Sequence, residues 1–284
     1  MSKELDLLSD FGTQSPDVLS RLVWKLATHR FLSSDRRRRI RKSLAARFSG
    51  PFDLRIDDIF MRAYPMENYC DRIAIGRGHL PESAERGLIG PLLKPGMVFV
   101  DIGANVGTYS LFVAQRCQDS ATIISFEPHP RTFAKLSYNI RANGFSAIEA
   151  VNQGVGPQAG RMVLHSSGGS NIGTASLLPQ AAGDKHQVEI KVGLLSHALK
   201  SRMIGQVDLL KIDIEGFEDR ALLPLMTDEH VALWPKALLI ETALKEHWQT
   251  DCVAELLARG YTNAGQTGEN ILLLHPEAKG RSEP

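Results

Sequence analysis

Two acidic residues of this chain directly follow apolar runs that predict buried β-strands. Asp101 comes after the run Met97–Val100, and Glu127 comes 26 residues later, after the run Ala121–Phe126. An acid at the carboxyl end of a parallel strand can bind an ammonium group or the hydroxyls of a ribose, whereas it repels a pyrophosphate. The spacing leaves room for a turn, one helix and the next strand. We therefore expect Asp101 to hold the ammonium group, and Glu127 the ribose, of a nucleotide-like ligand.

The turn that follows Asp101 is almost free of side chains. The residues that we expect to bind the ligand there are Gly103, Ala104, Asn105 and Gly107. Residues 108–116 predict the helix that this turn opens. A strand, a bare turn and a helix N-terminus form the socket in which α/β proteins bring backbone N–H groups against a nucleotide. Two roles that do not involve a ligand stay open, because Asp101 could cap the turn and Asn tolerates left-handed backbone.

A proline stops the second strand directly after Glu127. Pro128 cannot donate to a sheet, and we expect it to lie at the ligand site, where His129 and Pro130 can line the edge of an adenine pocket.

Three segments resemble the FkbM family of S-adenosylmethionine-dependent methyltransferases. They are Asp-Ile-Gly-Ala-Asn-Val-Gly-Thr-Tyr-Ser (101–110), Phe-Glu-Pro-His-Pro (126–130) and Leu-Lys-Ile-Asp-Ile-Glu-Gly-Phe-Glu (210–218). The resemblance extends from about residue 80 to about residue 274, and its third segment is the most specific. It implies S-adenosylmethionine as cofactor and O-methylation of a small molecule or saccharide. It also implies a Rossmann-like class I methyltransferase fold, an α/β architecture with a mainly parallel seven-stranded sheet and helices on both faces.

With this cofactor, further residues acquire expected roles. Gln153 and Gly154 follow the third strand of the core, where the adenine amino group would lie, although a plain turn is an equal alternative. Asn171 and Thr174, together with Ser176, belong to a long polar loop that resembles the acceptor-reading loop of the family. A surface loop without such a role stays open as the alternative.

The third segment supplies the candidate catalytic groups. Strand alternation predicts that Lys211, Asp213 and Glu215 share one side of the fourth strand end, near the transferable methyl group. Asp213 is our first candidate for a general base toward a hydroxyl, and Glu215 is the second. Both could instead bind substrate or cap the next helix. Glu241 ends the fifth strand and is expected to contact the substrate. These acids could also hold a divalent metal, but no spacing requires one and we expect none.

Two other functions would use the same kind of sheet. A nicotinamide-dependent oxidoreductase would need glycine where Asn105 stands, and Asp101 would face the pyrophosphate of its dinucleotide. A sensor or scaffold that binds S-adenosylmethionine without catalysis would not need the acids at 213 and 215. Both are less consistent with the residues than a methyltransferase that catalyses methyl transfer.

The elements that position these residues divide the chain into three expected parts. Residues 1–50 predict a helical extension, residues 51–96 a lid that includes a strand at 72–75 and a helix at 81–93, and residues 97–278 the cofactor-binding domain. Arg36–Lys42 is a basic run, which indicates a solvated helix face or a weak contact with an anionic membrane surface.

Composition narrows the class of protein further. The chain has 284 residues, 43% of them hydrophobic, and a formal net charge of +1, so nucleic acid is not an expected partner. Its three cysteines form no CxxC pair, and no signal peptide or membrane-spanning run is evident. We expect a cytoplasmic protein whose oligomeric state and acceptor the sequence does not specify.

Overall fold

A seven-stranded sheet forms the centre of the computed structural model, which describes residues 5–27, 33–166, 175–178 and 186–276. Its strands lie in the order β11-β12-β10-β9-β3-β4-β5. Their bounds are β3 Val98–Ile102, β4 Thr122–Phe126, β5 Ile148–Val151, β9 Leu209–Ile212, β10 Ala237–Glu241, β11 Thr262–Gln266 and β12 Asn270–Leu274. β12 runs antiparallel to both of its neighbours, whereas β5, β4, β3, β9 and β10 are parallel. The expected Rossmann-like methyltransferase fold is therefore confirmed.

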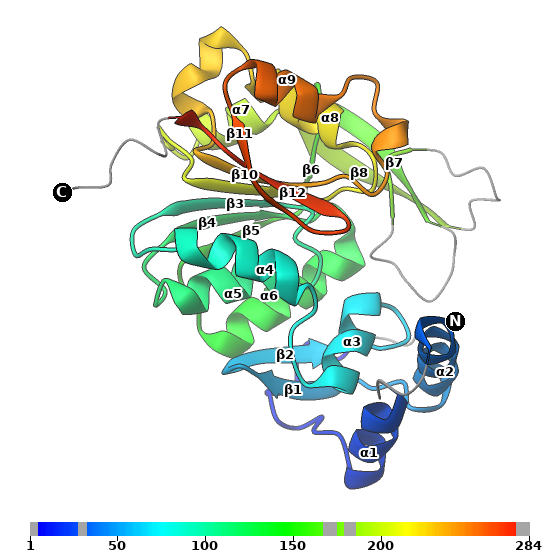
Figure 1. The fold of residues 1–284 in the computed structure, drawn as a ribbon. Coiled ribbons are helices and arrows are strands. Elements are labelled where there is room, and N and C mark those ends of the chain that lie inside the picture. The colour runs from blue at the N-terminus through cyan, green and yellow to red at the C-terminus, as the bar shows by residue number, and fades with distance from the viewer. Residues whose placement is uncertain (1–4, 28–32, 167–174, 179–185, 277–284) are drawn as a thin grey trace.

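Helices cover both faces of this sheet (Figure 1). On one face lie α4 (Ser83–Ile89), α5 (Thr108–Arg116) and α6 (Pro130–Asn143), and on the other lie α7 (Leu195–Lys200), α8 (Glu218–Leu222) and α9 (Cys252–Ala258). Two cores result because alternate side chains of a strand point to opposite faces. Phe99 and Leu209 belong to the first core, whereas Val100 and Leu210 belong to the second.

Short elements complete the domain. A three-stranded sheet of order β6-β8-β7 is built from β6 (Gly154–Val155), β7 (Gly160–Ser166) and β8 (His186–Gly193). The described residues also form the short 3₁₀ helices η1 (Gly90–Leu92), η3 (Leu223–Leu225), η4 (Asp228–Leu233) and η5 (Lys245–His247). Among the helices that the structure describes, none combines the length and the hydropathy needed to cross a membrane.

The N-terminal elements form a layer below α5 and α6 (Figure 1). They are α1 (Val18–Ala27), α2 (Ser34–Arg47), the antiparallel pair β1 (Phe52–Ile56) and β2 (Ile59–Ala63), and α3 (Tyr69–Arg77). The strand predicted at residues 72–75 is wrong, because this segment is the middle of α3. The ends of α3 explain the helix. Asn68 accepts hydrogen bonds from the backbone N–H groups of Cys70 and Asp71, and Gly78 ends the helix in a left-handed conformation.

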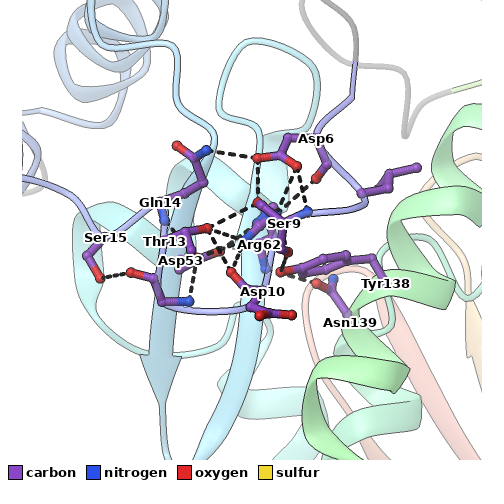
Figure 2. Close-up of polar contacts among 12 residues, drawn as sticks. Asp6, Ser9, Asp10, Thr13, Gln14, Ser15, Asp53, Arg62, Tyr138 and Asn139 are labelled. Atoms are coloured by element: carbon purple, nitrogen blue, oxygen red, sulfur yellow. Dashed lines mark hydrogen bonds and ion pairs between the residues drawn. The ribbon is translucent and has the colours of Figure 1, made fainter.

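A buried arginine ties the chain segment before α1 to this layer (Figure 2). The Arg62 guanidinium, on β2, donates to both carboxylate oxygens of Asp53, at 2.6 and 2.9 Å. It also donates to the carbonyl oxygens of Asp6, Ser9 and Asp10, and it lies 4.2 Å from the ring centroid of Tyr138 on α6. Residues 5–17 contain no helix or strand, and these hydrogen bonds satisfy part of their backbone.

Candidate active site

A cavity of about 240 Å³ opens at the carboxyl ends of β3, β4, β9 and β10. Open α/β sheets bind ligands at this edge, where the strand order reverses. The cavity wall also includes residues of α3, of the segment before α4, and of the β11–β12 hairpin.

The turn after β3 forms the floor of the cavity. Gly103, Ala104 and Asn105 line it, as the sequence led us to expect, whereas Gly107 does not and instead packs against Leu136 of α6. Gly103 has a φ of +78°, and a Cβ atom there would lie 2.0 Å from the carbonyl oxygen of Asp213. The bare backbone therefore brings the ends of β3 and β9 into direct contact.

Glu127 is held with its carboxylate at the cavity. Its two oxygens accept hydrogen bonds from the backbone N–H groups of Asn105 (3.0 Å) and His129 (2.8 Å). Burial raises the pKa of Glu127 to about 7, and these N–H groups oppose that rise. Pro128 lines the cavity beside it, and so does His129, whereas Pro130 does not. The geometry suits a carboxylate that accepts hydroxyl groups of a ligand.

Asp101, which we expect to hold the ammonium group directly or through water, lies beneath the cavity wall. Its side chain is fully buried and is absent from the cavity lining. One carboxylate oxygen accepts a hydrogen bond from Ser110 Oγ at 2.5 Å, and the other lies 3.7 Å from Lys211 Nζ. Asp101 and Lys211 are direct neighbours in the β3–β9 register, so the acid supports the lysine.

Lys211 is a buried cation at the centre of the site. Its Nζ donates to the carbonyl oxygen of Gly103 at 2.9 Å and lies 3.5 Å from Asp213 Oδ2. Burial alone would lower its pKa, but the carboxylates of Asp213, Asp101 and Glu82 raise it above the usual lysine value. Lys211 is therefore charged, and it connects the glycine turn to the acids of the fourth strand end.

Three carboxyl groups lie next to Lys211 around the cavity, namely Asp213, Glu215 and Glu241. Burial and the neighbouring Asp213 raise the pKa of Glu241 far above its ordinary range, so Glu241 is protonated at neutral pH. Burial, with Asp213 and Glu218 adding to it, raises the pKa of Glu215 to about 8. Asp213 makes the ion pair with Lys211 and keeps part of its side chain exposed to the cavity.

The turn that carries these acids is fixed from below by Glu218. One carboxylate oxygen of this buried side chain accepts from the backbone N–H groups of Ile214 and Gly216, and the other accepts from Trp248 Nε1 at 2.7 Å. Strand alternation predicts that Asp213 points to the ligand side, and Asp213 does line the cavity. However, β9 ends at Ile212, and Glu215 has a φ of +58°. The turn, and not the strand, therefore places Glu215. Ile214 packs against the second core, as expected, and also lines the cavity.

Gln153 and Gly154 line the opposite end of the cavity, at the start of β6. The Gln153 side chain occupies space that Gly193 leaves open, because a Cβ atom at Gly193 would lie 2.3 Å from Gln153 Nε2. This close fit fixes the direction of the Gln153 amide at the end where we expect the adenine.

Between β7 and β8, the structure describes residues 175–178. Asn171 and Thr174 lie outside the described residues. Ser176 is buried, and its hydroxyl donates to the carbonyl oxygen of Glu215 at 2.8 Å, while Ala175 and Leu177 line the cavity. Ser176 therefore supports the turn of Glu215. In the described part of the chain, no group of three His, Cys, Asp or Glu side chains has an arrangement that could hold a metal ion.

Several lining residues are not among the site residues that the sequence predicts. They are Tyr69 and Cys70 on α3, Glu82 before α4, Tyr109 on α5, and Glu269 and Asn270 at the β11–β12 hairpin. The Tyr109 hydroxyl hydrogen-bonds Glu82, whose pKa is raised to about 7 by burial and by Asp213. Asn68 Nδ2 donates to Asn105 Oδ1 at 2.6 Å and so joins the segment before α3 to the glycine turn. These contacts are between distant segments. Among these residues the sequence suggests only Glu82, as an acid of the predicted lid helix at 81–93 that could face the ligand or solvent.

Among the described residues that line the cavity, acids greatly outnumber bases. Six carboxyl groups lie there, from Glu82, Glu127, Asp213, Glu215, Glu241 and Glu269, whereas the lining contains one lysine and no arginine. A cavity of this composition attracts cations and repels phosphates.

Comparisons with known proteins agree with this geometry. Residues 101–233 match the family model described as "Methyltransferase FkbM domain". The chain is 31% identical over 156 residues to 31-O-demethyl-FK506 methyltransferase FkbM of Streptomyces tacrolimicus, over 46% of this chain and 60% of that protein. It is 30% identical over 148 residues to Methyltransferase 1 of Beauveria bassiana, over 46% and 59%. It is 27% identical over 128 residues to hexuronic acid methyltransferase AglP of Haloferax volcanii, over 43% and 46%. The chain thus spans about half the length of these relatives.

Proposed function

We propose that this protein, whose residues 101–233 match the methyltransferase FkbM domain model, is an S-adenosylmethionine-dependent O-methyltransferase that acts on a hydroxyl group of a small molecule or saccharide. The observation that carries the proposal is the acid-rich cavity at the carboxyl edge of the sheet. S-adenosylmethionine carries a sulfonium and an ammonium group, and both favour surrounding carboxylates. A nicotinamide dinucleotide would instead bring a pyrophosphate against the same acids, which argues against an oxidoreductase.

The residues of the cavity fit this cofactor, and each part of it has a candidate partner. Glu127 would accept the ribose hydroxyls, because backbone N–H groups already fix its carboxylate at the cavity. Backbone at Gly103, Ala104 and Asn105 would pass beside the amino-acid part, and Pro128, Gln153 and Gly154 would line the adenine end. Asp101 would act indirectly, through Lys211. When bound, the cofactor supplies an activated methyl group on sulfur.

For the chemical step, the protein has to orient a hydroxyl group and accept its proton. We assign the proton acceptor to Asp213, whose carboxylate is partly exposed to the cavity and is positioned by Lys211 at 3.5 Å. Glu215 is the second candidate, because its pKa of about 8 gives it greater basicity once it is ionised. Glu241, held protonated beside Asp213, can donate a hydrogen bond to the acceptor.

The charge of the cavity also restricts the acceptor. Carboxylates accept hydrogen bonds from hydroxyl groups, so an uncharged polyol or polyketide suits the site better than a sugar acid or a phosphate ester. Of the two relatives whose names state an acceptor, the FK506 methyltransferase therefore indicates the class more closely than the hexuronic acid methyltransferase.

Replacing the proposed base tests this function. We expect Asp213→Asn to bind S-adenosylmethionine as the wild type does and to form S-adenosylhomocysteine about 10²- to 10⁴-fold more slowly with a panel of sugars and hydroxylated metabolites. Asp228→Asn, at an exposed acid of η4, is the matched control and should leave the rate unchanged. An undiminished rate in Asp213→Asn would exclude Asp213 as the base. The same outcome in Glu215→Gln would exclude the second candidate.

A further inference from the structure

Helix α1 turns an apolar stripe toward solvent. Val18, Leu19, Leu22 and Leu26 are between 54% and 83% exposed. Their spacing of three, four and seven residues places them on one side of the helix. The opposite side carries Ser20, Trp24 and Ala27, which are buried, so the helix packs through that side and leaves the leucines outward. Surface helices of globular proteins normally orient their apolar stripe inward, so this arrangement calls for a partner.

Exposed basic side chains are frequent on α1 and on the neighbouring helix α2. Arg21 and Lys25 are exposed on α1, and α2, which packs against α1, exposes Arg36, Arg39, Lys42 and Arg47. Among the described residues of the two helices and Asp17, which directly precedes α1, six bases are exposed but only two acids, Asp17 and Asp35. The whole chain has a formal net charge of only +1, so positive charge is concentrated here. We name the exposed side chains of α1 and α2 the α1–α2 surface.

The structure also changes how the basic run Arg36–Lys42 is interpreted. Arg41 is only 4% exposed and lies over the ring of Tyr69, whose side chain lines the cavity. Arg41 therefore packs inward, and the outward charge comes from its neighbours. The surface therefore combines the exposed leucines of α1 with the exposed bases of α1 and α2. The sequence of α2 alone does not predict this combination.

Exposed leucines that are bordered by arginine and lysine match an anionic lipid surface. Apolar side chains enter the region between headgroups and acyl chains, while the bases contact the acidic headgroups. A second copy of the chain fits poorly, because a symmetric contact would bring two basic surfaces together. Nucleic acid would pair with the bases but leave the leucines in water. We propose that the α1–α2 surface docks this protein on anionic membranes.

The surface is firmly connected to the catalytic half of the molecule. The Arg62 network anchors residues 6–10, which lead into α1, and α1 packs against α3, whose first residues Tyr69 and Cys70 line the cavity (Figures 1 and 2). Docking would therefore hold the cavity at a fixed position relative to the membrane. The proposal does not depend on the methyl-transfer reaction.

Flotation with lipid vesicles tests the proposal. The purified chain is mixed with phosphatidylcholine vesicles that contain or lack phosphatidylglycerol, at low and at high salt. We expect binding to the anionic vesicles that weakens at high salt, and little binding to the neutral ones. Arg36→Gln with Arg39→Gln should lower the affinity at least tenfold, since each charge near the surface contributes about fivefold. Leu22→Gln with Leu26→Gln should lower it by a similar factor.

Matched variants elsewhere on the molecule serve as controls. Met203→Gln with Val231→Gln removes two exposed apolar side chains, and Arg161→Gln with Lys191→Gln removes two exposed bases. Circular dichroism and S-adenosylmethionine titration establish that each variant is folded. Absence of binding to anionic vesicles would overturn the proposal, as would equal losses in the control pairs. A dimer in sedimentation equilibrium that the Leu22 and Leu26 changes dissociate would assign the surface to a second copy instead.

Discussion

At the scale of the residue, the cavity keeps several acids partly protonated until a cation arrives. Burial raises the pKa values of Glu82 and Glu127 to about 7 and that of Glu215 to about 8. Ionisation of each of these groups therefore costs more free energy in the folded protein than it does in water. A bound cationic ligand reduces this cost, because its positive charge stabilises the carboxylates in place of the solvent that they lack.

The pH dependence of stability should reveal these acids. Because their folded-state pKa values are raised, their contribution to stability is fully present below the unfolded-state value of about 4.5 and is lost as pH rises through 7 to 8. We expect the ligand-free Tm to fall between about pH 5 and pH 8, and the increase in Tm caused by S-adenosylmethionine to grow over the same interval. Differential scanning fluorimetry measures both.

A double variant checks the origin of that trend. Glu82→Gln with Glu215→Gln should flatten the decline in Tm, whereas Glu149→Gln, at an exposed acid on β5, should leave it as it is. A decline that persists unchanged in the double variant would contradict the assignment.

At the scale of the element, the sequence predicts the helices and strands that have a regular apolar pattern. It predicts few of the features that arise from contacts between distant segments. Strands β3, β4 and β10, at or next to whose ends Asp101, Glu127 and Glu241 lie, follow from their apolar runs. Strand β11 escapes prediction because its residues, Thr-Asn-Ala-Gly-Gln, are mostly polar and lie at the edge of the sheet. The sequence also does not predict that the Asp101 side chain points away from the cavity. This orientation depends on Lys211, which lies 110 residues later in the chain, on the neighbouring strand β9.

The junction of β3 and β9 can be tested at Gly103. Gly103→Ala should destabilise the protein by more than about 2 kcal/mol and abolish cofactor binding, because the new methyl group would lie 2.0 Å from the Asp213 carbonyl oxygen. Gly96→Ala is the control: Gly96 has a similar φ of +77° but has no other atom within 4 Å of such a methyl group. Urea unfolding compares the two variants, and equal losses would show that backbone strain alone is responsible.

At the scale of the whole molecule, the N-terminal layer packs against the sheet domain through the described residues that precede β3. Arg62 on β2, Asp53 on β1 and Tyr138 on α6 meet in one buried cluster (Figure 2). Nothing in the sequence identifies Arg62, since its partners lie up to 76 residues away. Helices α1 and α2 lie within residues 1–50, and the three-part division at residues 50 and 96 stays a prediction.

Removing the Arg62 charge should therefore loosen the N-terminal layer. We expect Arg62→Met to cost about 3–5 kcal/mol of unfolding free energy, because it leaves Asp53 buried and without its ion pair. Arg55→Met removes an exposed pair with Asp58 in the same hairpin and should cost less than about 1 kcal/mol. Denaturant unfolding, with limited proteolysis of residues 5–17, measures the difference. Equal costs would show that the cluster contributes no special stability.

Calorimetric titration with S-adenosylmethionine tests the central claim most directly. We predict saturable binding of S-adenosylmethionine and no binding of a nicotinamide dinucleotide. Glu127→Ala should weaken the binding about tenfold or more, as the loss of hydrogen bonds to a charged group implies, while Glu149→Ala should not. Tight dinucleotide binding, or S-adenosylmethionine binding that Glu127→Ala leaves unaltered, would contradict the assignment of this cavity to a methyl donor.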